Sequence, residues 1–381
     1  MPGFEIIDSK EFLRLKKIFQ AEKVFFRYGF ENIRKKQFFV EKFENDFAKK
    51  VKSKHALAVT SGSVALKIAL KTLRLKRGSR VLIPSFTFIA TLEAILENDL
   101  QPVICDIDMS LNLGTEYLKK FLIKKNIKVV VVVHMLGYPA NVKDILTMCK
   151  KNNVHLIEDT AWGLGGKIKK KYLGTIGRMG TFSFDYAKSI TTGEGGMIVF
   201  NNKSDYFFAK EYHDHGHKNK RNIPRYIDGR SRPGFNYRMS EIQGAIGIEQ
   251  LKKLDKIVKY QKTLAEMFKN RLKNKKIEFF IHPKNSYPTY DAFCFLVDSK
   301  SKAINIRKNL IKKNYATKIL PEASAWHFAK EWEHIKNIDK TNLLKSKMIL
   351  ERTVALPLSM KSKKKNVDEI SKIILEVISG N

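Results

Sequence analysis

The stretch KVVVVVHMLGYPANVKDILTMCKKNNVHLIED, residues 128–159, decides the fold class. It begins with five consecutive valines and ends with a second short apolar run at residues 154–158. Between these runs, residues 141–152 have the spacing of an amphipathic helix. Valine-rich runs without polar alternation are typical of strands buried on both faces of a parallel sheet. The stretch therefore predicts a strand–helix–strand unit, the repeating element of α/β folds.

The same alternation extends in both directions from this unit. We expect strands at residues 55–59, 80–83, 102–106, 128–134, 154–158, 181–184 and 196–200. We expect helices between them at residues 63–73, 88–97, 115–123 and 141–152. Strands separated by helices of this length predict a mostly parallel sheet with helices on its faces.

The C-terminal part of the sequence has a different pattern. Residues 213–234 are polar, basic and rich in Gly, Pro and Asn, which predicts a long loop, and an amphipathic helix with one break is expected at 240–273. Short strands and helices then alternate at residues 278–281, 292–297, 302–313 and 367–378. For a chain of 381 residues we predict two domains, a large α/β domain over 1–255 and a smaller α+β domain over 256–381.

The composition argues against several classes of protein. Cys105, Cys149 and Cys294 are far apart and form neither a disulfide framework nor a metal-binding spacing, so we expect buried thiols. The longest apolar run, near residues 129–133, is far shorter than the roughly 20 residues of a membrane span. The opening MPGFEIIDSKEFLRLKK lacks the apolar core of a signal peptide. We therefore expect a soluble, cytoplasmic protein without membrane insertion.

The formal net charge of +34 is unusually high. Nucleic-acid or anionic-membrane binding would be one explanation. The basic residues, however, occur in short scattered clusters such as 169–171, 273–276 and 361–365, without interleaved aromatic residues. We expect a general attraction for anionic substrates and no nucleic-acid partner.

The residues that could take part in catalysis or ligand binding follow the ends of predicted strands, where ligands bind in α/β sheets. Gly62 and Ser63, in the TSGS turn at 60–63, open a predicted helix whose free N–H groups suit a phosphate, although Ser and Gly are also ordinary capping residues. Asp159 ends a strand, where it can cap a helix, form an ion pair or bind a protonated pyridine nitrogen.

Lys188 differs from the many other lysines because it follows a strand end and precedes the glycine-rich stretch TTGEGG at 191–196. A lysine that is partly desolvated near a cationic cofactor loses its proton more easily, which suits Schiff-base formation. Ser183, at the end of the same strand, would add a hydroxyl to a phosphate site.

Five long motifs in this order resemble the DegT/StrS family of sugar aminotransferases, a branch of the fold-type I enzymes that use pyridoxal 5'-phosphate (PLP). They are SGSVALKIAL at 61–70, VLIPSFTFIAT at 81–91, IEDTAWGLGG at 157–166, GTFSFDYAKSITTGEGGMI at 180–198 and GFNYRMSEIQGAIGIEQLKKL at 234–254. The resemblance covers nearly the whole chain. It implies PLP as cofactor, L-glutamate as amino donor, an anionic sugar as acceptor, and a homodimer with a shared active site.

The resemblance also implies a role for each matching residue. Lys188 matches the lysine that holds the cofactor covalently, Asp159 the partner of the ring nitrogen, and Phe88 the aromatic residue that stacks on the ring. The residues that match the phosphate site are Gly62, Ser63, Ser183 and, from the partner subunit, Asn236.

One position departs from the family pattern. Trp162 stands where many members have a Gln that contacts the ring hydroxyl. Trp can donate through its indole N–H but is far bulkier, so either the hydroxyl is bound differently or the pocket is reshaped. Relatives that remove a hydroxyl have His at the position of Lys188, so the resemblance implies a transaminase.

Finer features are similar to the 8-amino-3,8-dideoxy-manno-octulosonate transaminases of lipopolysaccharide biosynthesis. They are the opening MPGFE and residues 26–31, 214–217, 326–327 and 332–334. This similarity favours 3,8-dideoxy-8-oxo-manno-octulosonate as the acceptor. A nucleotide-diphosphate keto-hexose is the alternative, and charge does not decide because both are anionic. A non-catalytic PLP-fold regulator is a remote third hypothesis.

Two polar segments allow more than one interpretation. On a strand, His213, His215 and His217 would share one face and could bind a metal, but the expected chemistry needs none, so we predict no metal site. The basic segment 218–232 is predicted to grip a carboxylate or phosphate of the substrate, because Arg side chains suit both, or else to be a solvated loop.

Overall fold

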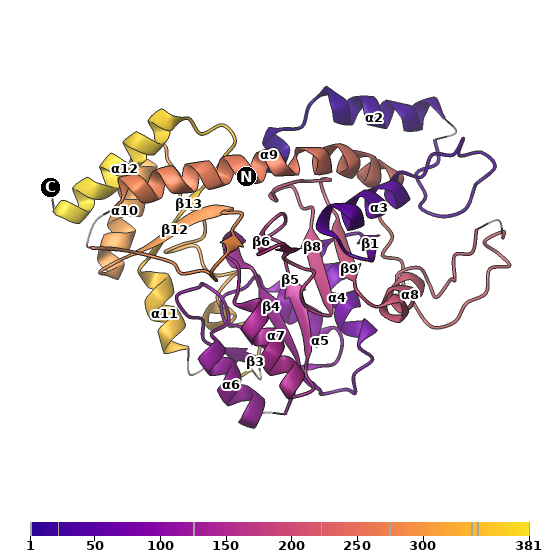
Figure 1. Ribbon diagram of the computed structural model, residues 1–381, viewed down its shortest axis with the longest axis horizontal. Helices are drawn as coiled ribbons and strands as arrows, with labels where there is room; N and C mark the ends of the chain where they lie inside the picture. The colour runs from indigo at the N-terminus through magenta and orange to yellow at the C-terminus, as the bar shows by residue number, and fades with distance from the viewer. Residues whose placement is uncertain are drawn as a thin grey trace.

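The computed structural model describes residues 2–21, 23–124, 126–221, 223–273, 276–336, 338–340 and 343–380. Within these ranges a seven-stranded sheet forms the centre of the molecule, in the order β1-β9-β8-β5-β4-β2-β3 (Figure 1). The strands are β1 (His55–Val59), β2 (Arg80–Pro84), β3 (Gln101–Cys105), β4 (Ile127–Val133), β5 (His155–Asp159), β8 (Met179–Ser183) and β9 (Gly196–Phe200).

The sheet is mostly parallel, which confirms the predicted fold class. β3, β2, β4, β5 and β8 pair in parallel, and only the β9 pairings, with β8 and β1, are antiparallel within the described sheet. Val129 to Val133 are each at most 1% exposed, as expected for a strand covered on both faces. Every strand predicted for this sheet is present, with ends shifted by about two residues or fewer.

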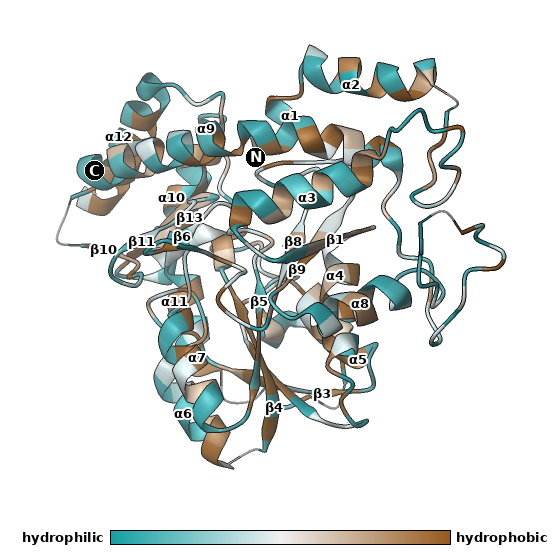
Figure 2. Ribbon diagram, turned by 45° about the vertical axis from the view of Figure 1, so that its right-hand side comes forward, coloured by the Kyte–Doolittle hydropathy of each residue, from teal (hydrophilic) through white to brown (hydrophobic). Residues whose placement is uncertain are grey.

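Helices cover both faces of the sheet. One face is covered by α4 (Gly62–Thr72), α5 (Ala90–Leu96) and α8 (Lys203–Tyr212). The other face is covered by α3 (Phe39–Val51), α6 (Thr115–Lys124), α7 (Val142–Lys151) and the first half of α9 (Glu241–Arg271). Figure 2 shows the hydrophobic residues concentrated on the central strands and on the helical surfaces that face them. The predicted helix at 88–97 begins later than expected, so Phe88 lies just before α5.

α9 is one continuous helix of 31 residues, so the predicted break was wrong. Ser240 and Gln243 form a capping box at its start. Its first half packs on the core of the central sheet, whereas Leu264 and Phe268 pack on the core of the C-terminal part. Figure 1 shows α9 spanning from the central sheet to the C-terminal elements. The predicted boundary at 255 lies inside this helix, and the domain division stays a prediction.

The C-terminal part combines antiparallel strands with helices. Its sheet has the order β10-β12-β13, formed by β10 (Ile277–Phe279), β12 (Ala292–Val297) and β13 (Thr353–Pro357). Helices α10 (Lys300–Lys312) and α12 (Lys364–Ser379) share one hydrophobic core with this sheet. The predicted smaller α+β architecture is present here, although β13 was not anticipated.

The remaining elements are short or peripheral. A small three-stranded sheet is formed by β11 (Ser286–Tyr287), β6 (Lys167–Ile168) and β7 (Lys171–Tyr172). The other helices are α1 (Pro2–Glu5), α2 (Ser9–Gln20), η1 (Met135–Gly137), η2 (Ala329–Glu331) and α11 (Leu344–Glu351). In the described ranges, no helix is both long and apolar enough to cross a membrane. All three cysteines are buried free thiols, as predicted.

Candidate active site

A cavity of about 410 Å³ opens at the carboxyl ends of β4, β5 and β8, where Val133, Asp159 and Ser183 line it. The carboxyl edge of a parallel sheet is the usual place for a ligand site in α/β proteins. The predicted site residues that line this cavity are Gly62, Ser63, Phe88, Asp159, Trp162, Ser183 and Lys188. The fold therefore brings together residues that are up to about 120 positions apart in the chain.

Asp159 is 5% exposed and lies at the end of β5. One of its carboxylate oxygens accepts a hydrogen bond of 3.1 Å from Thr91 Oγ1, and the other accepts one of 3.1 Å from the Ala161 N–H. Burial raises the pKa of Asp159 above its ordinary value, against the opposing effect of these two donors. A buried carboxylate held this way is suited to a cationic N–H partner in the cavity.

The neighbouring Glu158 is fully buried on the other side of the strand and helps to hold the end of β5 in place. It accepts hydrogen bonds from the N–H groups of Gly174, Ile176 and Gly177, at 2.9, 2.6 and 2.6 Å. His134 Nε2 lies 3.0 Å from the same carboxylate. Glu158 therefore fixes the end of β5 from behind, and Asp159 alone of the two acids faces the cavity.

Lys188 lies in the turn that follows β8. Its Nζ is 3.7 Å from the centroid of the Trp162 ring, a cation–π distance. Burial, and secondly repulsion by Lys318, lower the pKa of Lys188 to about 8. At pH 7 roughly a tenth of the amine is then neutral, the form that acts as a nucleophile.

Helix α1 holds the Lys188 turn in place. The Gly3 N–H donates a hydrogen bond of 3.0 Å to the carbonyl of Lys188, and the rings of Phe4 and Tyr186 stack with centroids 4.5 Å apart. A Cβ atom on Gly3 would lie 2.7 Å from that carbonyl oxygen, so only glycine permits this approach. The sequence motif MPGFE was noted only as a similarity, and its contact with the lysine turn was not predicted.

The opposite end of the cavity suits an anion. Ser61 caps α4, its Oγ accepting from the Val64 N–H at 3.2 Å, and Gly62 and Ser63 form the first turn. A Cβ atom on Gly62 would lie 2.7 Å from the Cβ of Ser183, so glycine brings the helix start and the serine together. Helix N-termini offer unpaired N–H groups and a favourable dipole to phosphate.

Aromatic side chains form one wall of the cavity. Phe88 is 40% exposed, and its ring lies 5.3 Å from His327 and 6.5 Å from Trp326. The His327 ring also packs edge-on against Trp162, with centroids 6.1 Å apart. Burial lowers the pKa of His327 to about 4, so this imidazole is neutral near pH 7.

Sequence reasoning did not assign Thr91, Lys318 or His327 to this cavity, although residues 326–327 were noted for their similarity to a subgroup. Thr91 binds Asp159, and His327 and Lys318 come from the C-terminal part. Thr91 lies one helical turn beyond Phe88, so the spacing i, i+3 could have indicated it. Lys318 is one lysine among many in a chain with 72 basic residues, and no local motif marks it.

Asn236 is exposed and lies outside the cavity. It forms a bridge with Asp214, and its Oδ1 accepts a hydrogen bond of 3.4 Å from the Arg238 N–H. A residue that reaches the phosphate site of a partner subunit would be exposed in one protomer. Its predicted role stays a prediction.

The histidine segment does not form the strand that the alternative of a metal site would need. His213 caps the end of α8, and His215 has a φ of 51°, which places it in a turn. His217 forms an isolated bridge with Arg230. Among the described residues, no group of three or more His, Cys, Asp or Glu side chains could hold a metal ion.

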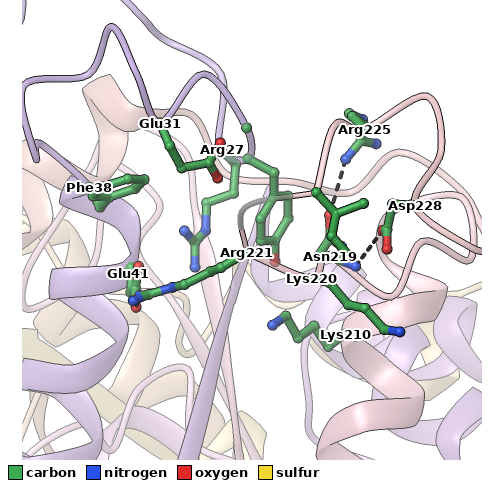
Figure 3. Close-up of a pocket in the computed structure, with 13 residues that line it drawn as sticks. Arg27, Glu31, Phe38, Glu41, Lys210, Asn219, Lys220, Arg221, Arg225 and Asp228 are labelled. Atoms are coloured by element: carbon green, nitrogen blue, oxygen red, sulfur yellow. Dashed lines mark hydrogen bonds and ion pairs between the residues drawn. The ribbon is translucent and has the colours of Figure 1, made fainter.

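The basic loop lines a second, smaller pocket of about 80 Å³ that shares no residue with the first (Figure 3). Asp214 accepts from both Arg225 and Arg238, and Arg225 Nη1 lies 2.7 Å from it. Arg221 pairs with Glu41, and Figure 3 shows its guanidinium directed at this carboxylate. Arg221 and Arg225 of this loop therefore pair with carboxylates of the same protomer.

The first cavity fits PLP on its own chemistry. A flat pyridine ring with a phosphate needs an anion site, an aromatic face, a carboxylate for the ring nitrogen and a lysine amine. The α4 N-terminus, Phe88, Asp159 and Lys188 offer these four groups around one space.

Comparisons with known proteins agree with a PLP site in this cavity. The model of the DegT/DnrJ/EryC1/StrS aminotransferase family matches residues 32–375. The GDP-perosamine synthase of Escherichia coli O157:H7 is 32% identical over 281 residues, which cover 74% of this chain and 75% of that protein.

Two solved structures have the same fold. An aminotransferase from Psychrobacter cryohalolentis superposes with a TM-score of 0.87 at 22% identity, covering 98% of both chains. A GDP-4-keto-6-deoxymannose-3-dehydratase, solved with a trapped PLP-glutamate geminal diamine, superposes with a TM-score of 0.85 at 25% identity, covering 97% of this chain and 98% of that one. The chain belongs to the DegT/DnrJ/EryC1/StrS aminotransferase family, and it is a PLP-dependent sugar aminotransferase.

Proposed function

We propose that this protein moves the amino group of L-glutamate to a carbonyl carbon of an anionic sugar, with PLP bound to Lys188. One observation supports this most strongly: segments distant in sequence bring a lysine of lowered pKa, a buried carboxylate and a helix N-terminus into one cavity. The reaction balances without a further reactant, because glutamate gives 2-oxoglutarate and the sugar exchanges its carbonyl oxygen for the amino group.

Each residue has a distinct part in this proposal. PLP, when bound, supplies an electron sink for the carbon that loses a proton. The amine of Lys188 removes that proton and returns it elsewhere, while Asp159 holds the ring nitrogen protonated. Ser63, Ser183 and the α4 N-terminus bind the phosphate, and Phe88 covers the ring. Since both half-reactions use the same site, ping-pong kinetics are expected.

Lys188 also favours transamination over removal of a hydroxyl. Proteins similar to this chain include both a GDP-perosamine synthase and a GDP-4-keto-6-deoxy-D-mannose 3-dehydratase. A transaminase needs an amine that shuttles the proton in both directions, and a neutral lysine amine is suited to both steps.

For the acceptor, we propose 3,8-dideoxy-8-oxo-manno-octulosonate. Two of the segments similar to that subgroup lie together in the fold, since Tyr28 Oη is 3.3 Å from His213 Nε2, beside residues 214–217. A third, Trp326–His327, packs on Phe88 at the cavity. A nucleotide-diphosphate keto-hexose is the second candidate, because the synthase and the dehydratase similar to this chain are named for GDP-linked sugars.

The proposal includes a cytoplasmic homodimer in which Asn236 and the basic loop 218–232 face the partner's cavity. Exposed apolar side chains on this loop, such as Tyr226 and Ile227 at 88% and 62%, are consistent with a covered surface in a dimer. The loop would then grip the anionic acceptor.

The absorbance spectrum of the protein with PLP, before and after L-glutamate, tests the first half-reaction. We expect a visible band that bleaches with glutamate and that is missing in Lys188→Ala. A protein that forms no band, or whose band ignores glutamate, would contradict the proposal and favour the regulator hypothesis, for which a salt-sensitive DNA gel shift is the direct test.

The amine form of the enzyme then distinguishes the acceptors. We expect the octulosonate aldehyde to restore the visible band at micromolar to millimolar concentrations. Restoration by a GDP-linked 4-keto-hexose, and not by the octulosonate, would assign the second candidate instead.

A further inference from the structure

Two lysine amines contact the same indole ring in the cavity. Lys188 Nζ lies 3.7 Å and Lys318 Nζ 4.3 Å from the centroid of Trp162. Lys318 is in the loop that follows α10, far from Lys188 in sequence, yet both side chains line the same cavity. Two like charges at one ring repel each other.

Lys318 is held in position by a buried carboxylate. The side chains of Lys318 and Asp291 are 9% and 1% exposed, and the Lys318 ammonium donates to Asp291 Oδ2. Burying an ammonium costs several kcal/mol unless a partner compensates for it. Asp291 supplies that compensation and holds the Lys318 ammonium at the cavity that Lys188 lines.

The other charged groups around Lys188 determine how strongly this charge acts. Asp159 and Asp185 attract the protonated amine, as does Asp291 more weakly than Lys318 repels it, while the neutral His327 adds no charge. Glu194 also lines the cavity. Burial is the largest cause of the lowered pKa of Lys188, and repulsion by Lys318 is the second.

We propose that Lys318 is a positioning residue that increases the neutral fraction of the Lys188 amine by charge repulsion, with Asp291 and Trp162 fixing its place. The inference rests on the proposed role of Lys188. Only the neutral amine has the free electron pair that forms the C–N bond with the PLP aldehyde, and this condensation releases one water. A nearby positive charge therefore raises the reactive fraction at neutral pH.

This also gives Trp162 a function. The face of an indole ring attracts ammonium groups without neutralising them, which a carboxylate would do. Trp162 therefore holds the amines of Lys188 and Lys318 at one ring.

The test is competitive labelling of the cofactor-free protein with acetic anhydride between pH 6 and pH 11, with Lys188 acetylation quantified by mass spectrometry. Lys313, an exposed lysine, serves as the internal standard in each sample. We expect an apparent pKa near 8 for Lys188 in the wild type. Lys318→Met should raise it by about one unit, and Lys318→Arg should leave it nearly unchanged.

Lys318→Arg is the matched control, because it keeps a positive charge beside Asp291 while it changes the shape of the side chain. A merely structural role of Lys318 would loosen the cavity in both variants, admit water and raise the apparent pKa of Lys188 in both. An equal rise in Lys318→Arg and Lys318→Met, or no shift in Lys318→Met, would overturn the inference.

Two further measurements keep the outcome interpretable. Thermal melting identifies a variant that fails to fold. If Lys318→Met does not fold, Lys318→Met/Asp291→Asn, which removes both charges, replaces it and should still raise the apparent pKa of Lys188 above the wild-type value, because Lys318 acts on Lys188 more strongly than Asp291 does. The labelling does not depend on turnover. Failure of the proposed function would appear as a missing PLP band, whereas failure of this inference would appear only in the labelling profile.

Discussion

The Lys188 cavity and the loop around Asp214 both bury positive charge, but they treat it in opposite ways. In the loop, the fully buried Asp214 accepts from Arg225 and Arg238, so the guanidinium groups are neutralised where they lie. In the cavity, Lys188 contacts an indole ring, and its closest cationic neighbour at that ring is another lysine. Paired charge fixes a loop, whereas a lysine placed beside another cation becomes a weaker base and a better nucleophile.

Replacing Lys188 should produce the largest effect. In Lys188→Ala and Lys188→Arg we expect the PLP band to disappear and transamination to fall by about a thousandfold or more, because neither side chain forms the C–N bond with the cofactor. The measurements are the absorbance spectrum and the steady-state rate with L-glutamate. The Arg variant keeps the charge, so substantial activity in it would show that the amine chemistry does not reside at this position.

Another substitution of the same residue, Lys188→Met, should stabilise the protein, whereas Asp214→Asn in the loop should destabilise it. The folded-state pKa of Lys188 is lowered to about 8, so the folded protein holds this proton less tightly than the unfolded chain does. The resulting penalty is present below about pH 8 and disappears as the pH rises above the ordinary lysine pKa of about 10.4. We expect Lys188→Met to raise the melting temperature at pH 7 more than at pH 10. An unchanged or lowered melting temperature at pH 7 would contradict this.

Asp214→Asn should destabilise the protein by about 3 kcal/mol, because it leaves two arginines beside a buried neutral side chain. Although burial opposes ionisation, hydrogen bonds and charge from Arg225 and Arg238 hold the pKa of Asp214 well below its ordinary value. This stabilisation is present above about pH 4 and is lost as the pH falls through the lowered pKa.

Urea unfolding between pH 3 and pH 7 checks this prediction. We expect the difference between wild type and variant to be full at pH 7 and to shrink below pH 4. Asp46→Asn, which removes an exposed i,i+4 pair with Lys42, is the matched control and should change stability by less than about 0.5 kcal/mol. Equal effects at the two positions would show that the Asp214 cluster is not a structural anchor.

Asp159→Asn should slow transamination by about a hundredfold while the protein still binds PLP. Asn keeps an oxygen for the Ala161 N–H but no charge for the ring nitrogen. The rate at which glutamate bleaches the PLP band in a single turnover measures the effect directly. Thr91→Val, which removes one hydrogen bond to the same carboxylate, should cost only a few-fold. A near-normal rate in Asp159→Asn would reject the proposed role of this acid.

Much of the fold was predictable because its signals are local. The valine run at 129–133 and the other short apolar runs of the first 200 residues each indicate a buried strand on their own. All seven strands of the central sheet were predicted from them. The break expected in α9 was wrong. The first part of this helix packs on the core of the central sheet and its later part on the core of the C-terminal part, and one continuous helix makes both contacts.

The candidate site was predictable only where a residue belongs to a recognisable motif. Lys188, Asp159 and Gly62 stand in such motifs, and the fold places them in one cavity. Lys318 reaches the cavity through the packing of the C-terminal part, which leaves no trace in its neighbouring sequence. The alternative that His213, His215 and His217 share one face of a strand is not met, because a helix end and a turn with positive φ occur there.

Arg221→Ala should give the smallest effect and addresses the basic loop. Arg221 pairs with Glu41, but its side chain is 72% exposed, so we expect a stability change below about 0.5 kcal/mol. If the loop grips an anionic acceptor in the partner's cavity, KM for that acceptor should rise several-fold with kcat unchanged, and the increase should weaken at high salt. An unchanged KM at low salt would mean that the loop is only solvated. Both regions would then still bury positive charge, but only the Lys188 cavity would use it in the reaction.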